Sequence, residues 1–310
     1  MKISIIGAAG TVGSATAFAI AVQGLADELV MIDEKQNTVG NHAMDINTAV
    51  SGMFNIDVRA GNYDDLKDTD ITIISAGVHL SANMPQEDKI KPNIPIINNI
   101  AANVEKHCPE SIVIMVTNPI DVLNYVFFLS GSFDRKRLMG YNWNDSMRFR
   151  DAAAKALGVK TAQVAGIAAG YHPVATVSLF SSLKIDGKTV SIDEEKKKRI
   201  TEEARSYLRT LDSLNASRTA GWTTAAGLAS TVKAIRDDAK VLMPCSAVLE
   251  GEYGYRNLSI GVPVIIGKNG IEKILEWDLP TEERQEMDKV AEKVKADCTL
   301  AKDLLNSARK

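Results

Sequence analysis

The sequence predicts an α/β protein in which a Rossmann domain, built on a doubly wound parallel sheet, is followed by an α+β domain. Short apolar, β-branched runs alternate with amphipathic stretches through the first half, and a glycine-rich turn directly follows the first run. Because alternating strands and helices require crossover connections, we expect parallel strands. The pattern changes after about residue 145, so we assign residues 1–143 to the Rossmann domain and residues 144–310 to the α+β domain.

The first half contains four buried-strand candidates, recognised by consecutive apolar and β-branched residues. They are Ile3–Ile6, Leu29–Ile32, Ile71–Ser75 and Ile112–Val116. The amphipathic stretches between and after them predict helices at Thr11–Gln23, Thr38–Val50, Ile94–His107 and Asp121–Leu129. This order predicts a Rossmann sheet.

The second half mixes strands and longer helices. Strands are predicted at Val164–Ala168, Ala175–Leu179, Leu242–Leu249 and Ser259–Ile266, with a hairpin of Leu183–Ile185 and Thr189–Val190 that turns at Asp186-Gly187. Helices are predicted at Asn144–Arg150, Asp193–Leu211 and Trp222–Asp238, and from about Thr281. Because no flexible linker separates the halves, we expect them to pack closely, with a ligand in the crevice at the carboxyl ends of the parallel strands.

Composition excludes several classes of protein. Hydrophobic residues make up 45% of the 310 residues and charged residues 24%, as in soluble globular proteins, and the net charge of −3 gives no reason to expect a nucleic-acid partner. Three widely spaced cysteines (Cys108, Cys245 and Cys298) suit neither a disulfide framework nor a zinc site. No apolar run approaches membrane-spanning length, and no signal peptide precedes the first strand. We therefore expect a cytoplasmic protein with no membrane partner and no metal.

The turn after the first strand has the form of a dinucleotide-binding site. It reads Gly7-Ala8-Ala9-Gly10-Thr11-Val12-Gly13. Gly7 and Gly10 permit a tight turn and close approach to a pyrophosphate, and Gly13 permits close packing of helix and sheet. Free N–H groups at the helix start, where Thr11 and Val12 lie, would face the phosphates. An ordinary strand-to-helix turn is the alternative.

Asp33 makes that alternative less attractive. It ends the second strand, twenty positions after Gly13. A carboxylate there accepts hydrogen bonds from the adenosine ribose and repels a 2′-phosphate, so NAD is favoured over NADP. A solvated carboxylate at a strand end is the structural interpretation.

Three further segments carry a family resemblance. They are Thr117-Asn118-Pro119-Ile120-Asp121, Asn144-Asp145-Ser146-Met147-Arg148-Phe149-Arg150 and Gly170-Tyr171-His172. Together with the glycine turn, they make the chain similar to the lactate/malate dehydrogenase family, particularly its archaeal-type malate dehydrogenase branch, over nearly the whole length. The resemblance implies the family fold, the use of NAD, a small-molecule 2-hydroxy or 2-oxo acid as substrate, and a homodimer or homotetramer.

The resemblance also implies roles for individual residues. His172 matches the family's acid/base histidine, and Asp145 the carboxylate that fixes its tautomer. Arg148 matches the arginine that binds the substrate carboxylate. Asn118 matches an asparagine that contacts substrate and nicotinamide, and Asn93 matches a cofactor contact. Each residue taken singly could be structural, but the 27 positions from Asp145 to His172 are the family's own spacing.

The chain departs from the family in the loop after the third predicted strand. An ungapped comparison puts the family's substrate-reading arginine on Leu80 and its carbonyl-polarising arginine on Gln86. Pro173 and Val174 replace the Gly-Asp that follows the histidine, and Ala220 stands where the family often has threonine. We treat Leu80 and Gln86 as substrate-binding candidates. A shifted loop, in which Lys89 reaches inward, is the alternative.

These departures lead to two hypotheses. The first is an active NAD-dependent dehydrogenase for a 2-hydroxy acid with an uncharged side chain, because a second carboxylate would be desolvated without a partner. The second is an NAD-binding relative with weak or no activity and a regulatory or binding role. A Rossmann protein that binds no dinucleotide conflicts with the glycine turn and Asp33.

Overall fold

The computed structural model describes residues 1–78, 84–214, 216 and 219–309. Its first half contains strands β1 (Lys2–Ile6), β2 (Glu28–Ile32), β3 (Asp57–Gly61), β4 (Ile71–Ile74), β5 (Ile112–Met115) and β6 (Leu138–Tyr141). The helices of this half are α1 (Thr11–Ala21), α2 (Gln36–Val50), α3 (Gln86–Ile90), α4 (Ile94–His107) and α5 (Ile120–Leu129).

The second half begins with α6 (Trp143–Leu157) and ends with the long helix α9 (Thr281–Ala308). Between them lie β7 (Val164–Tyr171), β8 (Ala175–Ile185), β9 (Lys188–Thr189), α7 (Glu194–Ser213), α8 (Gly221–Arg236), β10 (Val241–Glu250), β11 (Arg256–Gly267) and β12 (Gly270–Ile274). Short 3₁₀ turns occur at Tyr63–Leu66, Arg135–Arg137, Thr161–Gln163 and Glu252–Gly254.

The strands of the described residues form one sheet of twelve, in the order β3-β2-β1-β4-β5-β6-β10-β11-β7-β8-β9, with β12 beside β11. The first six strands are parallel, which confirms the predicted Rossmann architecture. The pairing turns antiparallel where Cys245 of β10 meets Tyr141 of β6, and the second half continues from there. The sheet therefore continues from the first half of the chain into the second.

The predicted elements are confirmed with shifted ends, although the predicted strands Ala175–Leu179 and Leu183–Ile185 belong to one continuous strand, β8. Three strands and the short helix α3 were not predicted. β3 has an exposed first residue, the buried Val58 and three half-buried residues, so it lacks the uniformly apolar run of a central strand. β6 is only four residues long and contains Gly140, and β12 is short and partly exposed. These strands form because neighbouring strands offer them hydrogen bonds, which their local sequence does not signal.

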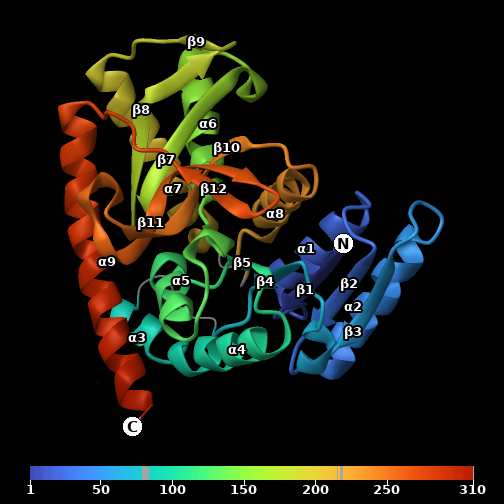
Figure 1. Cartoon of the computed structure of the whole chain (residues 1–310). Coiled ribbons are helices and arrows are strands. Elements are labelled where there is room, and N and C mark those ends of the chain that lie inside the picture. The colour runs from blue at the N-terminus through green and yellow to red at the C-terminus, as the bar shows by residue number, and fades with distance from the viewer. Residues whose placement is uncertain (79–83, 215, 217–218, 310) are drawn as a thin grey trace.

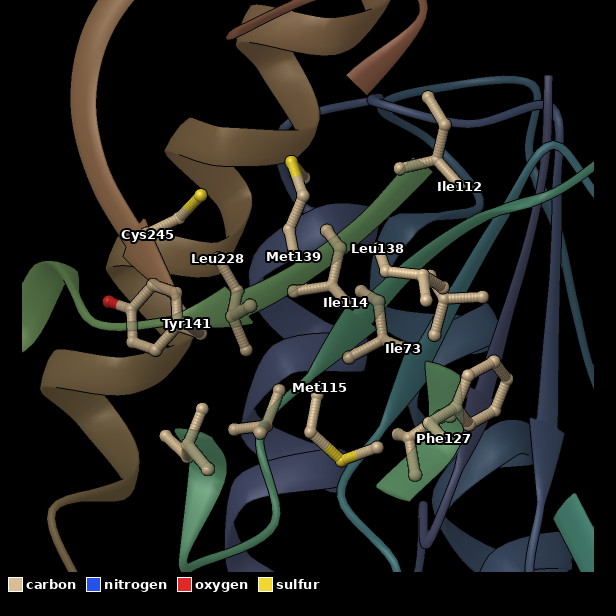
Figure 2. Packing of buried hydrophobic residues seen from close by; sticks show 14 of the residues in the cluster. Ile73, Ile112, Ile114, Met115, Phe127, Leu138, Met139, Tyr141, Leu228 and Cys245 are labelled. Carbon is tan, nitrogen blue, oxygen red and sulfur yellow. The ribbon is translucent and has the colours of Figure 1, made fainter. Parts of the chain in front are cut away.

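The core lies on both sides of the parallel strands. Figure 2 shows Ile73, Ile114 and Leu138 from three neighbouring strands packed together, with Leu228 of α8 beside Tyr141. All these residues are buried, and full burial of one such aliphatic side chain stabilises the fold by about 1.5–3 kcal/mol. The packed strands hold their carboxyl ends, where the candidate site lies, in fixed relative positions.

Helix α9 joins the two halves on one side of the molecule. In Figure 1 it runs past β8 and β11 of the second half and reaches α5 and α3 of the first half. Its buried residues include Met287, Val294 and Leu305. The helix therefore contacts segments that are far apart in the sequence.

Candidate active site

The glycine turn between β1 and α1 has no room for a side chain at Gly7 or at Gly13. Gly7 has a φ of +90°, and a Cβ atom there would lie 2.4 Å from the backbone nitrogen of Ala76. A Cβ at Gly13 would lie 2.4 Å from the carbonyl oxygen of Gly7. Gly10 is exposed and precedes the first turn of α1, whose N–H groups at Thr11 and Val12 lack acceptors within the helix. A diphosphate fits such a turn, because backbone donors can approach it closely.

The Asp33 carboxylate lies next to this turn, at the end of β2. One oxygen accepts a hydrogen bond of 3.0 Å from the backbone N–H of Ala9, and the other accepts one of 3.0 Å from that of Lys35. The side chain is only half-buried, so its oxygens can accept further hydrogen bonds. Its position suits contact with the ribose of a dinucleotide whose phosphates lie at the glycine turn.

Asp145 connects the predicted histidine and arginine. The residue lies in the first turn of α6, and its Oδ2 is 2.6 Å from Nδ1 of His172, which follows the last residue of β7. Its Oδ1 accepts a hydrogen bond of 3.0 Å from Nη1 of Arg148, one turn further along the helix. All three side chains are less than a tenth exposed. The structure therefore brings together three of the residues to which the resemblance assigns roles.

His172 is also held through its backbone. Its N–H donates to Oδ2 of Asp121 over 2.8 Å, and the side-chain amide of Asn142 donates to the other oxygen of Asp121 over 3.3 Å. Asp121 is fully buried on α5, and burial raises its pKa to about 6. Asp121 lies in the segment Thr117-Asn118-Pro119-Ile120-Asp121, but no role was predicted for it. The feature that could have indicated a role is an acidic residue in a mostly apolar helix.

The Arg148 guanidinium is buried and incompletely bonded. The ring of Tyr207 on α7 covers it, with the ring centroid 4.8 Å from Cζ. Nε is buried and has no hydrogen-bond partner among the described residues. A buried polar group without a partner costs about 1–3 kcal/mol or more, so a ligand that accepts from Arg148 would gain this energy back. A carboxylate is such a ligand.

Gln86 lies at the start of α3, and its side-chain contact was not predicted. Its Nε2 donates to the hydroxyl of Tyr171 over 3.0 Å, and that hydroxyl donates to Oδ2 of Asp297 over 2.8 Å. Neither Tyr171, in the segment Gly170-Tyr171-His172, nor Asp297 had a predicted role. The second loop candidate, Leu80, lies outside the described residues.

The two candidate asparagines have different surroundings. Asn93 is fully buried: its Oδ1 accepts from the Val78 N–H over 2.8 Å, and its Nδ2 donates to the Lys89 carbonyl over 2.9 Å. It thus ties together the two sides of the loop, and its contact with the cofactor stays a prediction. Asn118 is exposed at the carboxyl end of β5, on the sheet edge that also carries Gly7 and Asp33.

Two of the residues that depart from the family, Pro173 and Val174, directly follow His172 in the chain. Pro173, joined to His172 by a cis peptide bond, is exposed, and Val174 is half-buried. Ala220 is the N-cap of α8. Within the described part of the chain, no His, Cys, Asp or Glu cluster could hold a metal ion, and no helix has the length and apolarity needed to span a bilayer.

Comparison with known proteins identifies the family. Residues 1–140 match the lactate/malate dehydrogenase NAD binding domain, and residues 144–305 match the lactate/malate dehydrogenase alpha/beta C-terminal domain. The malate dehydrogenase of Natronomonas pharaonis is 35% identical over 297 residues, which are 94% of this chain and 97% of that protein. These matches confirm the predictions of NAD and of the archaeal-type branch.

Solved structures of malate and lactate dehydrogenases have the same fold as this chain. The malate dehydrogenase of Salinibacter ruber superimposes with a TM-score of 0.90 at 30% identity, covering 99% of this chain and 100% of that one. The minor L-lactate dehydrogenase of Enterococcus mundtii gives a TM-score of 0.89 at 26% identity, covering 96% and 97%. The chain therefore belongs to the lactate/malate dehydrogenase family and carries that family's NAD-binding domain.

Proposed function

We propose that this protein is an NAD-dependent dehydrogenase that interconverts a 2-hydroxy acid with an uncharged side chain and the corresponding 2-oxo acid. The arrangement that supports the proposal most is the Asp145 carboxylate, which contacts His172 with one oxygen and Arg148 with the other. An imidazole and a guanidinium held by one buried carboxylate can serve the two ends of such a substrate. One takes up the hydroxyl proton, and the other binds the carboxylate.

Each side chain contributes one step. With Nδ1 bonded to Asp145, the imidazole of His172 has Nε2 for the substrate hydroxyl, and Asp145 stabilises the imidazolium once the proton has moved. Arg148 anchors the substrate carboxylate, which would also provide an acceptor for its buried guanidinium. NAD, when bound, supplies the acceptor for the hydride that leaves the substrate carbon. In the opposite direction His172 returns the proton to the carbonyl oxygen.

The preference for an uncharged side chain rests on Leu80. Oxaloacetate and malate carry a second carboxylate, and without a cationic partner its desolvation costs several kcal/mol. Leucine at this place disfavours these acids and suits an apolar substituent. Gln86 replaces the second family arginine with a neutral residue, so polarisation of the substrate carbonyl is expected to be weaker.

The alternative of an NAD-binding relative without catalysis has no support from the comparisons. The similar proteins described above are named as malate and lactate dehydrogenases. The trio of Asp145, Arg148 and His172 is also assembled and buried. Because these relatives include both malate and lactate dehydrogenases, the substrate panel contains oxaloacetate and pyruvate as well as larger 2-oxo acids.

The test is steady-state NADH oxidation against this panel, with wild type, His172→Ala and the control His42→Ala on α2. We expect turnover of at least one acid with an uncharged side chain, and His172→Ala should lower kcat on the order of 10²–10⁴-fold because the proton donor is lost. NADH affinity, measured by fluorescence titration, should be preserved in both variants. Absence of turnover across the panel, or equal kcat in the two histidine variants, would refute the proposal.

Three broader assignments belong to the same proposal. We place the domain boundary between residues 143 and 144, at the start of α6 and directly after β6. A homodimer or homotetramer would cover large apolar side chains that are exposed in the single chain, such as Phe18, Met44 and Trp222. A cytoplasmic location suits the three buried cysteines, which form no disulfide.

A further inference from the structure

The hydroxyl of Tyr171 links three elements that are distant in the sequence. It accepts a hydrogen bond from Gln86 on α3, donates one to Asp297 on α9, and belongs to the last residue of β7. The ring is fully buried, although Gln86 and Asp297 lie nearer the surface. Tyr171 thus connects α3 and α9 from within the protein.

The hydrogen bonds of the Tyr171 hydroxyl determine whether the side chain at position 86 must be a donor or an acceptor. A carboxylate accepts only, so the phenolic proton points to Asp297, and the oxygen offers its lone pairs on the other side. The partner at position 86 must then be a donor, and the amide nitrogen of Gln86 is one. A bond to a carboxylate is stronger than a neutral one and makes the hydroxyl a better acceptor for Gln86.

Tyr171 is also the immediate neighbour of His172. The two residues bond to different helices, because Tyr171 reaches Asp297 on α9 while His172 reaches Asp145 on α6. Any force that holds the Tyr171 ring therefore acts on the backbone that carries the imidazole. The same hydroxyl connects this backbone to α3, the helix that follows the candidate position 80 in the chain.

We propose that Tyr171, with Asp297 as its anchor, is a positioning residue that holds Gln86 and α3 in a fixed place relative to His172. This inference rests on the proposed function, since it assigns Gln86 to the wall of the acid-binding site through its contact with Tyr171. Tyr171 itself touches neither substrate nor cofactor in this role. The network sets the affinity for the acid and leaves the NAD half of the site unchanged.

The chain offers a matched control. Tyr255, just before β11, donates to Asp288 on the same helix α9 over 2.7 Å, so Tyr255→Phe removes a tyrosine–aspartate bond of the same kind away from α3. Tyr171→Phe should raise KM for the best 2-oxo acid about tenfold, with kcat and NADH affinity changed by no more than about threefold. Tyr255→Phe should leave KM within about twofold of wild type. Equal KM values in the two variants would overturn the proposal.

Two further substitutions test the partners. Gln86→Met, at a partly exposed position, removes the amide with little change in volume and should reproduce the rise in KM, and the double variant Gln86→Met/Tyr171→Phe should be no worse than the poorer single variant. Asp297→Asn keeps an acceptor oxygen and should preserve KM, whereas Asp297→Leu should raise it. Two results would contradict the link from Asp297 through Tyr171 to Gln86. One is a KM in the double variant that rises by the product of the two single effects, and the other is a raised KM in Asp297→Asn.

A measurement without substrate separates this inference from the proposed function. Amide hydrogen exchange of the peptide covering residues 84–93 should be about tenfold faster in Tyr171→Phe and Gln86→Met than in wild type and Tyr255→Phe. If wild type turns over no acid while this exchange pattern appears, the proposed function fails and the positioning of α3 by Tyr171 stands. Unchanged exchange in both variants would refute the positioning role.

Discussion

In the proposed function, the side chain at position 80 sets the charge near the substrate's side chain. Leucine cannot neutralise a second carboxylate, whereas arginine binds one through two parallel hydrogen bonds. At position 86 glutamine keeps a donor without the positive charge, and it uses that donor on Tyr171. If both positions match the family's arginines, as proposed, the loop carries two fewer formal charges, and the substrate preference is expected to follow.

The residue-scale prediction concerns selectivity. Leu80→Arg should raise kcat/KM for oxaloacetate relative to pyruvate by about tenfold or more, because a charged hydrogen bond replaces an unpaired carboxylate. Leu80→Met, which changes shape without adding charge, is the control. Steady-state rates with both acids measure the ratio, and an equal ratio in the two variants would show that position 80 does not contact the substrate side chain.

At the scale of elements, two glycines differ in the space around them: Gly13, in the first turn of α1, is tightly packed, whereas Gly40, in α2, is not. Gly13 lies where a Cβ would collide with the carbonyl of Gly7, so α1 can pack against the sheet only with glycine there. Gly40 lies inside α2, and a Cβ there would meet nothing within 4 Å. Glycine in a helix interior without a packing reason costs roughly 0.5–1 kcal/mol relative to alanine.

These circumstances predict opposite results for the same substitution. Gly13→Ala should lower the free energy of unfolding by about 1–3 kcal/mol and weaken NADH binding, because α1 and its first turn must shift. Gly40→Ala should raise the free energy of unfolding by about 0.5–1 kcal/mol and leave NADH binding unchanged. Urea denaturation and NADH titration measure both quantities. A Gly13→Ala protein that matches wild type in both would contradict the role of the turn.

For the whole molecule, Asp121 is a connection between the halves. It lies on α5 of the first half and accepts the backbone N–H of His172 in the second half. Burial raises its pKa from 3.8 to about 6, so the folded protein binds this proton more tightly than the unfolded chain. The stability that the protonated group contributes is fully present below about pH 4 and is lost as the pH rises through 6.

This linkage gives a prediction for stability against pH. The difference in free energy of unfolding between wild type and Asp121→Asn should fall by about 2 kcal/mol from roughly pH 4.5 to pH 7, since the variant lacks the titrating group. Taking the difference removes the contributions of the other carboxylates. Urea unfolding at several pH values measures it, and a difference that is constant with pH would show that Asp121 does not titrate in this range.

Local patterns in the sequence predicted the parallel strands β1, β2, β4 and β5, the glycine turn and Asp33, because strand burial and tight turns depend on neighbouring residues. The family resemblance identified the trio of Asp145, Arg148 and His172. Local pattern failed for β3 and β6, whose few residues become strands only beside β2 and β5.

The amino-acid sequence by itself determined the fold class, the cofactor and the residues that match the catalytic ones. Only the tertiary structure decided that Tyr171 bonds to Gln86 and to Asp297, 85 and 126 positions away, and that Asp121 holds the backbone of His172. The physical reason is that backbone conformation follows from adjacent residues, whereas the partner of a buried polar group is set by which distant segments pack around it.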